Sequence, residues 1–217
     1  MTYLEAINKV LRRLREDEVA SPDSTAYSKL IGEFVNDANR LVEDAWDWGE
    51  LRAIRPLTLF ATSSYGTITS LNENFKILGV YNPTDKSELN RGTEKDYYNS
   101  VYLEDTPDGT PANYLFKGYT DADNTTAAFN FYPPTDKTRT LLFDIVDRSP
   151  ELVSGTSDIR TSGLAVVQFA QAMAAEERGE TGGTTSSKMY AMAQSTLSDA
   201  IAYDAARFPT ETVWYDV

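Results

Sequence analysis

The sequence contains neither cysteine nor histidine among its 217 residues. Without these side chains the chain cannot build Ser-His-Asp or Cys-His nucleophilic centres, thiol redox sites, or metal sites that depend on His or Cys ligands. No disulfide can form, so the stability of the fold must come from packing or from partners. Carboxylate pairs and lysine amines are the catalytic groups that remain.

Positive charge is also scarce. Lysine and arginine number 20 against 33 aspartate and glutamate residues, which gives a formal net charge of -13 and a sequence pI of about 4.4. A protein that grips nucleic acid needs a basic patch to neutralise phosphates. The cations here are scattered, and the one cluster, Arg12, Arg13 and Arg15, fits the solvated face of a helix. We therefore expect no specific binding of nucleic acid.

Long apolar runs are absent. No segment approaches the ~20 apolar residues that a membrane span requires, and the first residues lack the basic stretch and apolar run of a secretion signal. Hydrophobic residues nevertheless make up 41% of the chain, which is enough for a substantial core. We expect a soluble protein that folds in a cytoplasm and has no membrane partner.

Two helices are predicted at the start of the chain. Thr2 and Glu5 have the spacing of a capping box, which satisfies free amides at a helix start. A second helix, starting at Ser24 or Thr25, has the strongest apolar periodicity in the sequence, and Gly49 follows where a left-handed C-terminal cap is common. The expected buried stripe of this helix is Tyr27, Leu30, Ile31, Phe34, Val35, Ala38, Leu41, Val42, Ala45 and Trp46, and the expected solvated face is Glu33, Asn36, Asp37, Asn39, Arg40, Glu43 and Asp44.

Helical periodicity returns after residue 150. Ser157 or Asp158 is expected to cap a third helix, which the glycines of 179–183 interrupt. A fourth helix is expected from about Thr185 to Phe208. Its buried stripe should include Met192, Thr196 and Ile201.

Short β-type runs separated by turn residues occupy the middle of the chain. Pro56 in the first run favours an edge strand or a broken strand, since proline cannot donate to a sheet. Thr93 and Asp96 predict one short helix over 93–103 within this region. The expected strands are 51–60, 65–71, 75–81, 114–119, 126–132 and 140–146.

This order of elements predicts an α+β fold. The N-terminal and C-terminal helix pairs are expected to form a four-helix bundle, into which an antiparallel β-sandwich or barrel-like unit is inserted. The expected boundaries are 1–49 with 150–208 for the discontinuous bundle and 50–149 for the β unit. Residues 209–217 are too few for a further element and are expected to form a C-terminal docking arm.

Candidate catalytic and metal groups are weak. Carboxylate pairs such as Asp44/Asp47, Asp121/Asp123 and Asp144/Asp147 arise by chance in so acidic a chain. The stretch 121–124 faintly resembles a calcium loop but lacks its glycine and its closing glutamate, so a solvated turn is expected. We predict a protein that is not an enzyme and has no cofactor or metal.

Interface candidates are clearer. Val213, Trp214 and Tyr215 are large apolar groups close together in 209–217, and they are expected either to dock on a partner or to fold back on the helices. Tyr97, Tyr98 and Tyr102 form a cluster that suits an interface or a core equally well. Trp46 and Trp48 flank Asp47 at the junction of helix and strands, where they either seal a core or stack on a sugar.

Several of these segments together resemble the head-to-tail adaptors, or tail tubular A proteins, of short-tailed bacteriophages. Residues 6–11 read Ala-Ile-Asn-Lys-Val-Leu, and the long second helix closes on Trp46-Asp47-Trp48 before the first strand. The C-terminal helices contribute Leu-Ala-Val-Val-Gln-Phe-Ala-Gln-Ala at 164–172 and Ala-Tyr-Asp-Ala-Ala-Arg at 202–207. The similarity covers nearly the whole chain in pattern, although each motif alone is weak.

The resemblance implies a structural role. Such adaptors assemble as a ring, typically of twelve copies, between the portal protein and the tail nozzle protein, and tail fibres often attach nearby. Double-stranded DNA would pass through the channel without specific binding, which suits an acidic wall. The implied location is the neck or tail of the virion, with assembly in the host cytoplasm. The alternative is a carbohydrate-binding or carboxylate-based carbohydrate-cleaving virion module that uses Trp48, tyrosines and carboxylates.

Overall fold

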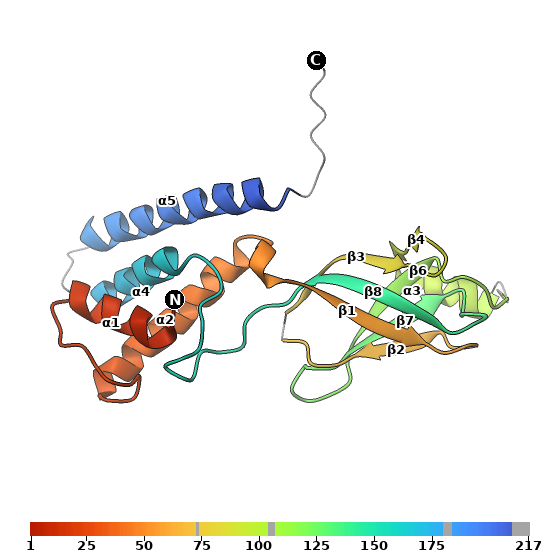
Figure 1. Ribbon diagram of the computed structural model, residues 1–217, viewed down its shortest axis with the longest axis horizontal. Helices are drawn as coiled ribbons and strands as arrows, with labels where there is room; N and C mark the ends of the chain where they lie inside the picture. The colour runs from red at the N-terminus through yellow and green to blue at the C-terminus, as the bar shows by residue number, and fades with distance from the viewer. Residues whose placement is uncertain (73, 104–106, 180–183, 210–217) are drawn as a thin grey trace, which may run out of the picture. The chain divides into compact units, whose positions relative to one another are not determined.

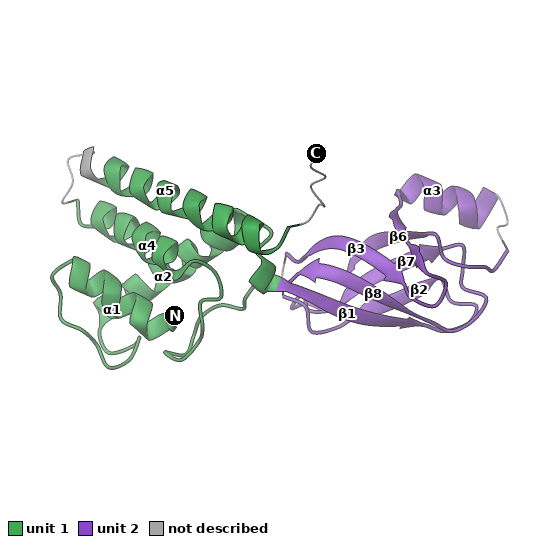
Figure 2. Cartoon of the chain, turned by 45° about the horizontal axis from the view of Figure 1, so that its top comes forward, with its two compact units in different colours: residues 1–51, 149–217 green, residues 52–148 purple. Residues whose placement is uncertain are grey.

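The computed structural model describes residues 1–72, 74–103, 107–179 and 184–209, and within them the chain is mixed α+β (Figure 1). These residues form five α-helices and two four-stranded sheets. The chain divides into two compact units, residues 1–51 with 149–217 and residues 52–148, called here the helical unit and the β unit (Figure 2). None of the helices described is both long enough and apolar enough to cross a bilayer.

The helical unit is built on α4, which packs against the other three long helices, while α1 also packs on α2. The expected capping box is present at the start of α1, where Glu5 N donates to Thr2 Oγ1 (3.2 Å) and Thr2 N donates to Glu5 Oε2 (3.0 Å). Thr25 caps α2 in the same manner. The elements of this unit are α1 (Tyr3–Arg13), α2 (Ala26–Asp44), the 3₁₀ turn η1 (Gly49–Leu51), α4 (Gly163–Glu177) and α5 (Thr184–Arg207).

The buried face of α2 differs from the expected one. Leu41, expected in the core, is 49% exposed, whereas Asn39 and Glu43, expected in water, are each 4% exposed. Asn39 Nδ2 donates to Glu43 Oε1 (3.1 Å), and Glu43 Oε2 accepts from the backbone nitrogen of Ser149 (3.2 Å). α2 therefore turns a polar strip toward the returning chain, which supplies hydrogen-bond partners that a hydrophobic pattern cannot reveal.

The predicted left-handed cap at Gly49 is wrong. α2 ends at Asp44, and Gly49 opens η1 without a positive φ. A Cβ at this position would lie 2.1 Å from Cδ2 of Phe208. The glycine is therefore needed for the close approach of the Phe208 ring, which comes from beyond the end of α5.

The predicted start of the third helix at Ser157 or Asp158 is also wrong, since α4 begins at Gly163. The segment before it is held extended by the N-terminus. Tyr3 N donates to Ser157 O (2.8 Å), and Ile159 N donates to Met1 O (2.9 Å). These long-range backbone bonds outcompete a local helix cap.

Helix α5 buries part of the expected stripe, since Thr196 and Ile201 are half-buried. Ala193 is fully buried, and Tyr190 lies against Phe169 with ring centroids 6.4 Å apart and donates to Glu176 Oε2 (3.1 Å). Met192, expected on the buried side, is instead 63% exposed. Met192 therefore lies on the outer face of α5, away from α4.

The β unit contains two sheets with the orders β1-β8-β3-β4 and β2-β7-β6-β5. Pro56 lies in β1, at an edge of the first sheet, so that prediction is confirmed. The strands are β1 (Arg52–Leu59), β2 (Tyr65–Ile68), β3 (Lys76–Asn82), β4 (Ser87–Glu88), β5 (Asn90–Arg91), β6 (Asn113–Tyr119), β7 (Ala127–Tyr132) and β8 (Arg139–Val146).

One strand pair departs from the antiparallel arrangement that we expected. β5 runs parallel to β6, whereas every other strand pairing in the described chain is antiparallel. β4 and β5 are consecutive in sequence but belong to different sheets. The chain crosses between the sheets at Leu89, whose side chain is buried, and this crossing sets the direction of β5.

Side chains from both sheets form one aromatic-rich core. Its centre is Phe129 on β7, whose ring lies 4.7 Å from that of Phe143 on β8. Helix α3 (Glu94–Tyr98) and the π-helical turn η2 (Asn99–Leu103) occupy the segment predicted as one short helix, and Thr93 caps α3. The buried core residues are Leu57, Leu59, Ile68, Leu71, Val80, Leu89, Tyr114, Ala127, Phe129, Phe131, Leu141, Phe143 and Ile145.

Candidate functional site

An exposed apolar cluster lies on α3 and η2. We call it the aromatic tip and define it as Tyr98, Val101, Tyr102 and Leu103, which are 51%, 37%, 72% and 78% exposed. The rings of Tyr98 and Tyr102 are stacked, with centroids 5.9 Å apart and an interplanar angle of 24°. Contiguous apolar surface of this kind is typical of a protein interface.

The third tyrosine of the predicted cluster anchors the tip. Tyr97 is half-buried, and its ring lies edge-on to Tyr98 (5.8 Å) and to the buried Tyr132 of β7 (5.9 Å). Tyr132 in turn packs against Gly92, where a Cβ would lie 1.9 Å from the phenol oxygen. The structure therefore divides the predicted cluster into one ring that joins the β unit and two that face solvent.

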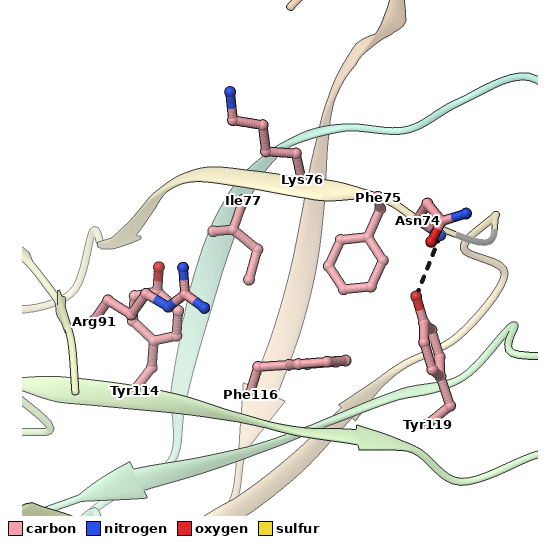
Figure 3. Close-up of a pocket in the computed structure, with 8 residues that line it drawn as sticks. All are labelled: Asn74, Phe75, Lys76, Ile77, Arg91, Tyr114, Phe116 and Tyr119. Atoms are coloured by element: carbon pink, nitrogen blue, oxygen red, sulfur yellow. Dashed lines mark hydrogen bonds between the residues drawn. The ribbon is translucent and has the colours of Figure 1, made fainter. Parts of the chain in front are cut away.

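A pocket of ≈ 420 Å³ in the β unit is lined by residues of both sheets (Figure 3). Phe75, Phe116 and Tyr119 lie edge-to-face on one another, with ring centroids 5.8, 6.2 and 5.6 Å apart. All three side chains are half-buried, so they present apolar surface to the opening. The other lining residues are Asn74, Lys76, Ile77, Arg91 and Tyr114.

Two β-bulges shape this pocket. The register of β6 against β7 shifts between Phe116 and Gly118, and Gly118 has a φ of +122°. Residues three apart in a regular strand face opposite sides, but the extra residue of a bulge lets Phe116 and Tyr119 line the same pocket. β3 shifts against β8 in the same way between Ile77 and Gly79. The pocket therefore depends on a backbone conformation that glycine adopts most readily.

Open strand edges lie beside the pocket. β5 pairs with only the first two residues of β6, and within the described residues Leu115–Tyr119 have no strand on that side. β4 pairs with only the last two residues of β3, so Ile77–Gly79 also lack a strand there in the described chain. Such edges present backbone groups that an added strand can use.

The rim of the pocket carries positive charge. Arg91 lies beside Tyr114 at one end, whereas at the other end the Asn74 backbone nitrogen donates to the Tyr119 hydroxyl (3.4 Å; Figure 3). Burial raises the pKa of the Tyr114 phenol, and the charge of Arg91 opposes this shift. The arrangement suits a ligand with an apolar ring and a neighbouring anionic group.

A buried arginine organises another part of the β unit. Arg139 is 2% exposed and donates to Asp85 Oδ2 (2.5 Å), to Asp136, and to the hydroxyls of Thr135 (2.5 Å) and Thr110 (2.9 Å). The hydrogen bond from Arg139 is the main cause that lowers the pKa of Asp85 from 3.8 to about 2. Because all these partners lie in segments between the strands, the network fixes loops rather than forming an open site.

The predicted carboxylate pairs do not converge on a site. Asp144 of β8 pairs with Arg52 of β1 (2.7 Å), and Asp147, just after β8, pairs with Arg55 of β1 (2.9 Å). Asp121 accepts from the backbone nitrogens of 125 and 126, so 121–124 form the expected turn. In the described part of the chain, no three His, Cys, Asp or Glu residues are grouped so that they could hold a metal.

The two tryptophans at the helix–strand junction have different environments. Trp48 is 4% exposed, and its indole nitrogen donates to Val42 O (2.7 Å). Trp46 is 38% exposed and donates to Asp204 (3.1 Å). Trp48 therefore seals the helical core and cannot stack on a sugar. The predicted docking residues Val213, Trp214 and Tyr215 lie outside the described residues.

Sequence reasoning missed the pocket and the Arg139 network. Phe75, Phe116 and Tyr119 fall in or next to predicted strands, where alternation alone places Phe116 and Tyr119 on opposite faces. A glycine inside a strand, here Gly118, is the signal that could have indicated the bulge. No protein-family model and no curated protein sequence matches this chain.

Proposed function

We propose that the protein is a structural head-to-tail adaptor of a short-tailed bacteriophage, which assembles as a ring of twelve copies between the portal protein and the tail nozzle protein. The observation that carries this proposal is the aromatic tip. Tyr102 and Leu103 are 72% and 78% exposed on a short helical projection, where they contribute nothing to the core of the β unit. Large apolar side chains in such positions stabilise an assembly rather than a monomer.

A second exposed surface lies on the helical unit. The outer face of α5 carries Met192 and Tyr203, which are 63% and 70% exposed. A ring subunit needs two different surfaces to contact its two neighbours, because the contact is head-to-tail. The aromatic tip and the outer face of α5 supply two such surfaces on different units of the chain.

The proposed finer architecture is a four-helix bundle with an inserted β-sandwich. Support for the bundle comes from α4, which packs on α1, α2 and α5. Support for the sandwich comes from the single core that side chains of both sheets share. The proposed ends of the bundle are 1–49 and 150–208, with 50–149 as the inserted unit and 209–217 as a docking arm.

The acidic character of the chain suits the proposed channel. A net charge of -13 per copy repels phosphates, so DNA would pass without being held. The proposed partners are the portal protein, the nozzle protein and tail fibres, in the neck or tail of a virion that assembles in the host cytoplasm. In this role the protein catalyses no reaction.

The carbohydrate-binding alternative is less well supported. Of the groups that it would use (Trp48, tyrosines and carboxylates), Trp48 has a buried and hydrogen-bonded indole. The aromatic rings of the pocket meet at 80° or 84°, which forms a notch rather than the flat platform on which a sugar stacks. The paired rings of Tyr98 and Tyr102 are the surface that keeps this alternative open to test.

Native mass spectrometry of the full chain, alone and mixed with the portal protein of the same phage, tests the proposal. Twelve copies of the 24.2 kDa chain give 12 × 24.2 ≈ 290 kDa. We expect this mass, or a portal complex that contains twelve copies. A chain that stays monomeric or trimeric under both conditions would contradict the proposal, and saturable binding of an oligosaccharide would favour the alternative.

A further inference from the structure

The open pocket beside β6 has the features of a peptide-docking site. It combines a half-buried aromatic notch, formed by Phe75, Phe116 and Tyr119, with an adjacent strand edge. Its volume of ≈ 420 Å³ lies within the range of about 300–1,000 Å³ that is usual for ligand sites and accommodates one large side chain. The notch therefore suits a ligand that presents an aromatic or branched side chain from an extended segment.

The charge at the rim narrows the choice of ligand. Arg91 is exposed at the Tyr114 end of the pocket, whereas the side chain of Lys76 on β3 points away from the rings (Figure 3). Glu88 also acts on the pKa of the Tyr114 phenol, but its effect is smaller than that of Arg91. The site therefore favours a peptide in which an acidic residue lies close to the aromatic one.

The sequence of this chain contains such a segment. Residues 210–217 read Thr-Glu-Thr-Val-Trp-Tyr-Asp-Val, which is rich in β-branched and aromatic residues and carries two acids. In an extended chain Trp214 and Asp216 point to the same side, about 7 Å apart. Tyr114, which pairs with Arg91, and Phe116 are likewise two residues apart on β6, so an indole packed on Phe116 places the carboxylate toward Arg91.

We propose that residues 210–217 of a second copy of this chain dock in this pocket as a strand added to the open edge of β6. Trp214 packs in the notch against the rings of Phe116 and Tyr119, and Asp216 faces Arg91. Because Tyr119 ends β6 and Arg91 lies opposite its beginning, this order runs the added strand antiparallel to β6. The proposal names the contact that joins neighbouring copies, and it rests on the proposed function only in requiring that copies of the chain associate.

A peptide-binding experiment on the full chain tests the pocket itself. The receptor carries Val213→Ala, Trp214→Ala and Tyr215→Ala, so that its own tail cannot compete. A fluorescein-labelled peptide of residues 209–217 is titrated and its anisotropy recorded. We expect saturable binding that weakens at least tenfold, about 1.4 kcal/mol, when the peptide carries Trp214→Ala.

Charge reversal supplies the specific readout. Arg91→Glu in the receptor should weaken peptide binding at least tenfold, and Asp216→Lys in the peptide should restore it. Lys117→Glu is the matched control, since Lys117 is an exposed cation of β6 that does not line the pocket. Thermal unfolding of each receptor checks that it is folded. The proposal would be overturned if the Arg91→Glu and Lys117→Glu receptors bound the peptide equally and Asp216→Lys gave no rescue. Absence of saturable binding would overturn it as well.

Mixing experiments separate docking between copies from docking within one copy. Full chain with Arg91→Glu lacks a working pocket, and full chain with the three tail alanines lacks a working tail. We expect a heteromeric complex only when the two are mixed, detected by native mass spectrometry. If the mixture stays monomeric while the peptide binds, the tail docks within its own chain and the proposal is wrong.

The same measurements distinguish this proposal from the ring proposal. Peptide binding with charge-swap rescue and a heteromeric complex, but no large assembly of the natural chain, would support the docking contact and contradict the ring. An assembly of ≈ 290 kDa without peptide binding would support the ring and contradict the docking contact. Saturable binding of an oligosaccharide that Phe116→Leu abolishes would show that the pocket is a sugar site and would also overturn the docking proposal.

Discussion

The indole nitrogen of Trp46 donates a 3.1 Å hydrogen bond to Asp204, 158 residues further along the chain. The same carboxylate oxygen accepts from the backbone nitrogen of Gly49 (3.1 Å), and Asp204 is only 8% exposed. One buried carboxylate thus connects the end of α5 to the segment that follows α2. This contact explains why a charged residue lies on the inner face of α5.

Removing that carboxylate should loosen α5. We expect Asp204→Ala to lower the free energy of unfolding by about 1–3 kcal/mol, because it leaves donors without a partner. Asp199→Ala, an exposed position on the same helix, should change it by no more than about 0.5 kcal/mol. Urea denaturation of the two variants measures both values. Equal stability would mean that water satisfies the Trp46 and Gly49 donors.

The buried stripe of α2 can be tested with one matched pair of substitutions. Ile31 is fully buried, so Ile31→Ala should cost about 2–5 kcal/mol. Leu41 is 49% exposed, so Leu41→Ala should cost less than about 1 kcal/mol, although the sequence pattern places it in the core. Thermal and urea unfolding report both. A large loss of stability in the Leu41→Ala variant would show that Leu41 is buried, as the apolar periodicity predicts.

The pKa of Asp85 predicts an acid dependence of stability. Arg139 lowers this pKa from 3.8 to about 2, so the ionised carboxylate stabilises the folded chain at neutral pH. Because the folded pKa lies below the unfolded one, this contribution is lost as the pH falls from about 4 toward 2. Urea unfolding between these pH values, with and without Asp85→Asn, should show a stability difference that shrinks with acidification. A difference that stays constant would contradict the prediction.

The bulge at Gly118 predicts an asymmetric response to alanine. Gly118 has a φ of +122°, so Gly118→Ala should destabilise the fold by about 1–3 kcal/mol through backbone strain. At Gly109 an added Cβ would meet nothing closer than Pro133 Cγ at 3.7 Å, and no positive φ is required. Gly109→Ala should therefore be close to neutral. Circular dichroism melting curves compare the two variants, and equal melting temperatures would argue against the bulge.

The aromatic tip should matter for assembly and not for folding. The double change Tyr102→Ser and Leu103→Ser removes exposed side chains, so the melting temperature of the monomer should stay within about 2 °C. The concentration needed for half-maximal assembly, measured by mass photometry, should rise at least tenfold. Tyr97→Ser is the contrasting control, because that ring packs on Tyr132 and its loss should lower the melting temperature. Unchanged assembly of the double variant would exclude the tip as an interface.

Local sequence signals determined the elements of this protein. The capping box of Thr2 and Glu5 and the cap at Thr93 depend on neighbouring residues, and the missing amide of Pro56 by itself disfavours a central strand; each is present as predicted. Apolar periodicity located the four long helices and the six longer strands to within a few residues, except at the start of α4. The absence of cysteine and histidine limited the available chemistry before any fold was considered.

Tertiary structure decided which faces are buried and which residues meet. The polar strip of α2 is buried because the chain returning at Ser149 supplies a partner for Glu43, and α4 starts late because the N-terminus holds 157–159 extended. The pocket exists because two strands from different sheets each gain a residue at a bulge. These outcomes depend on contacts between residues far apart in the sequence, whereas periodicity records only the preference of each segment for one apolar side.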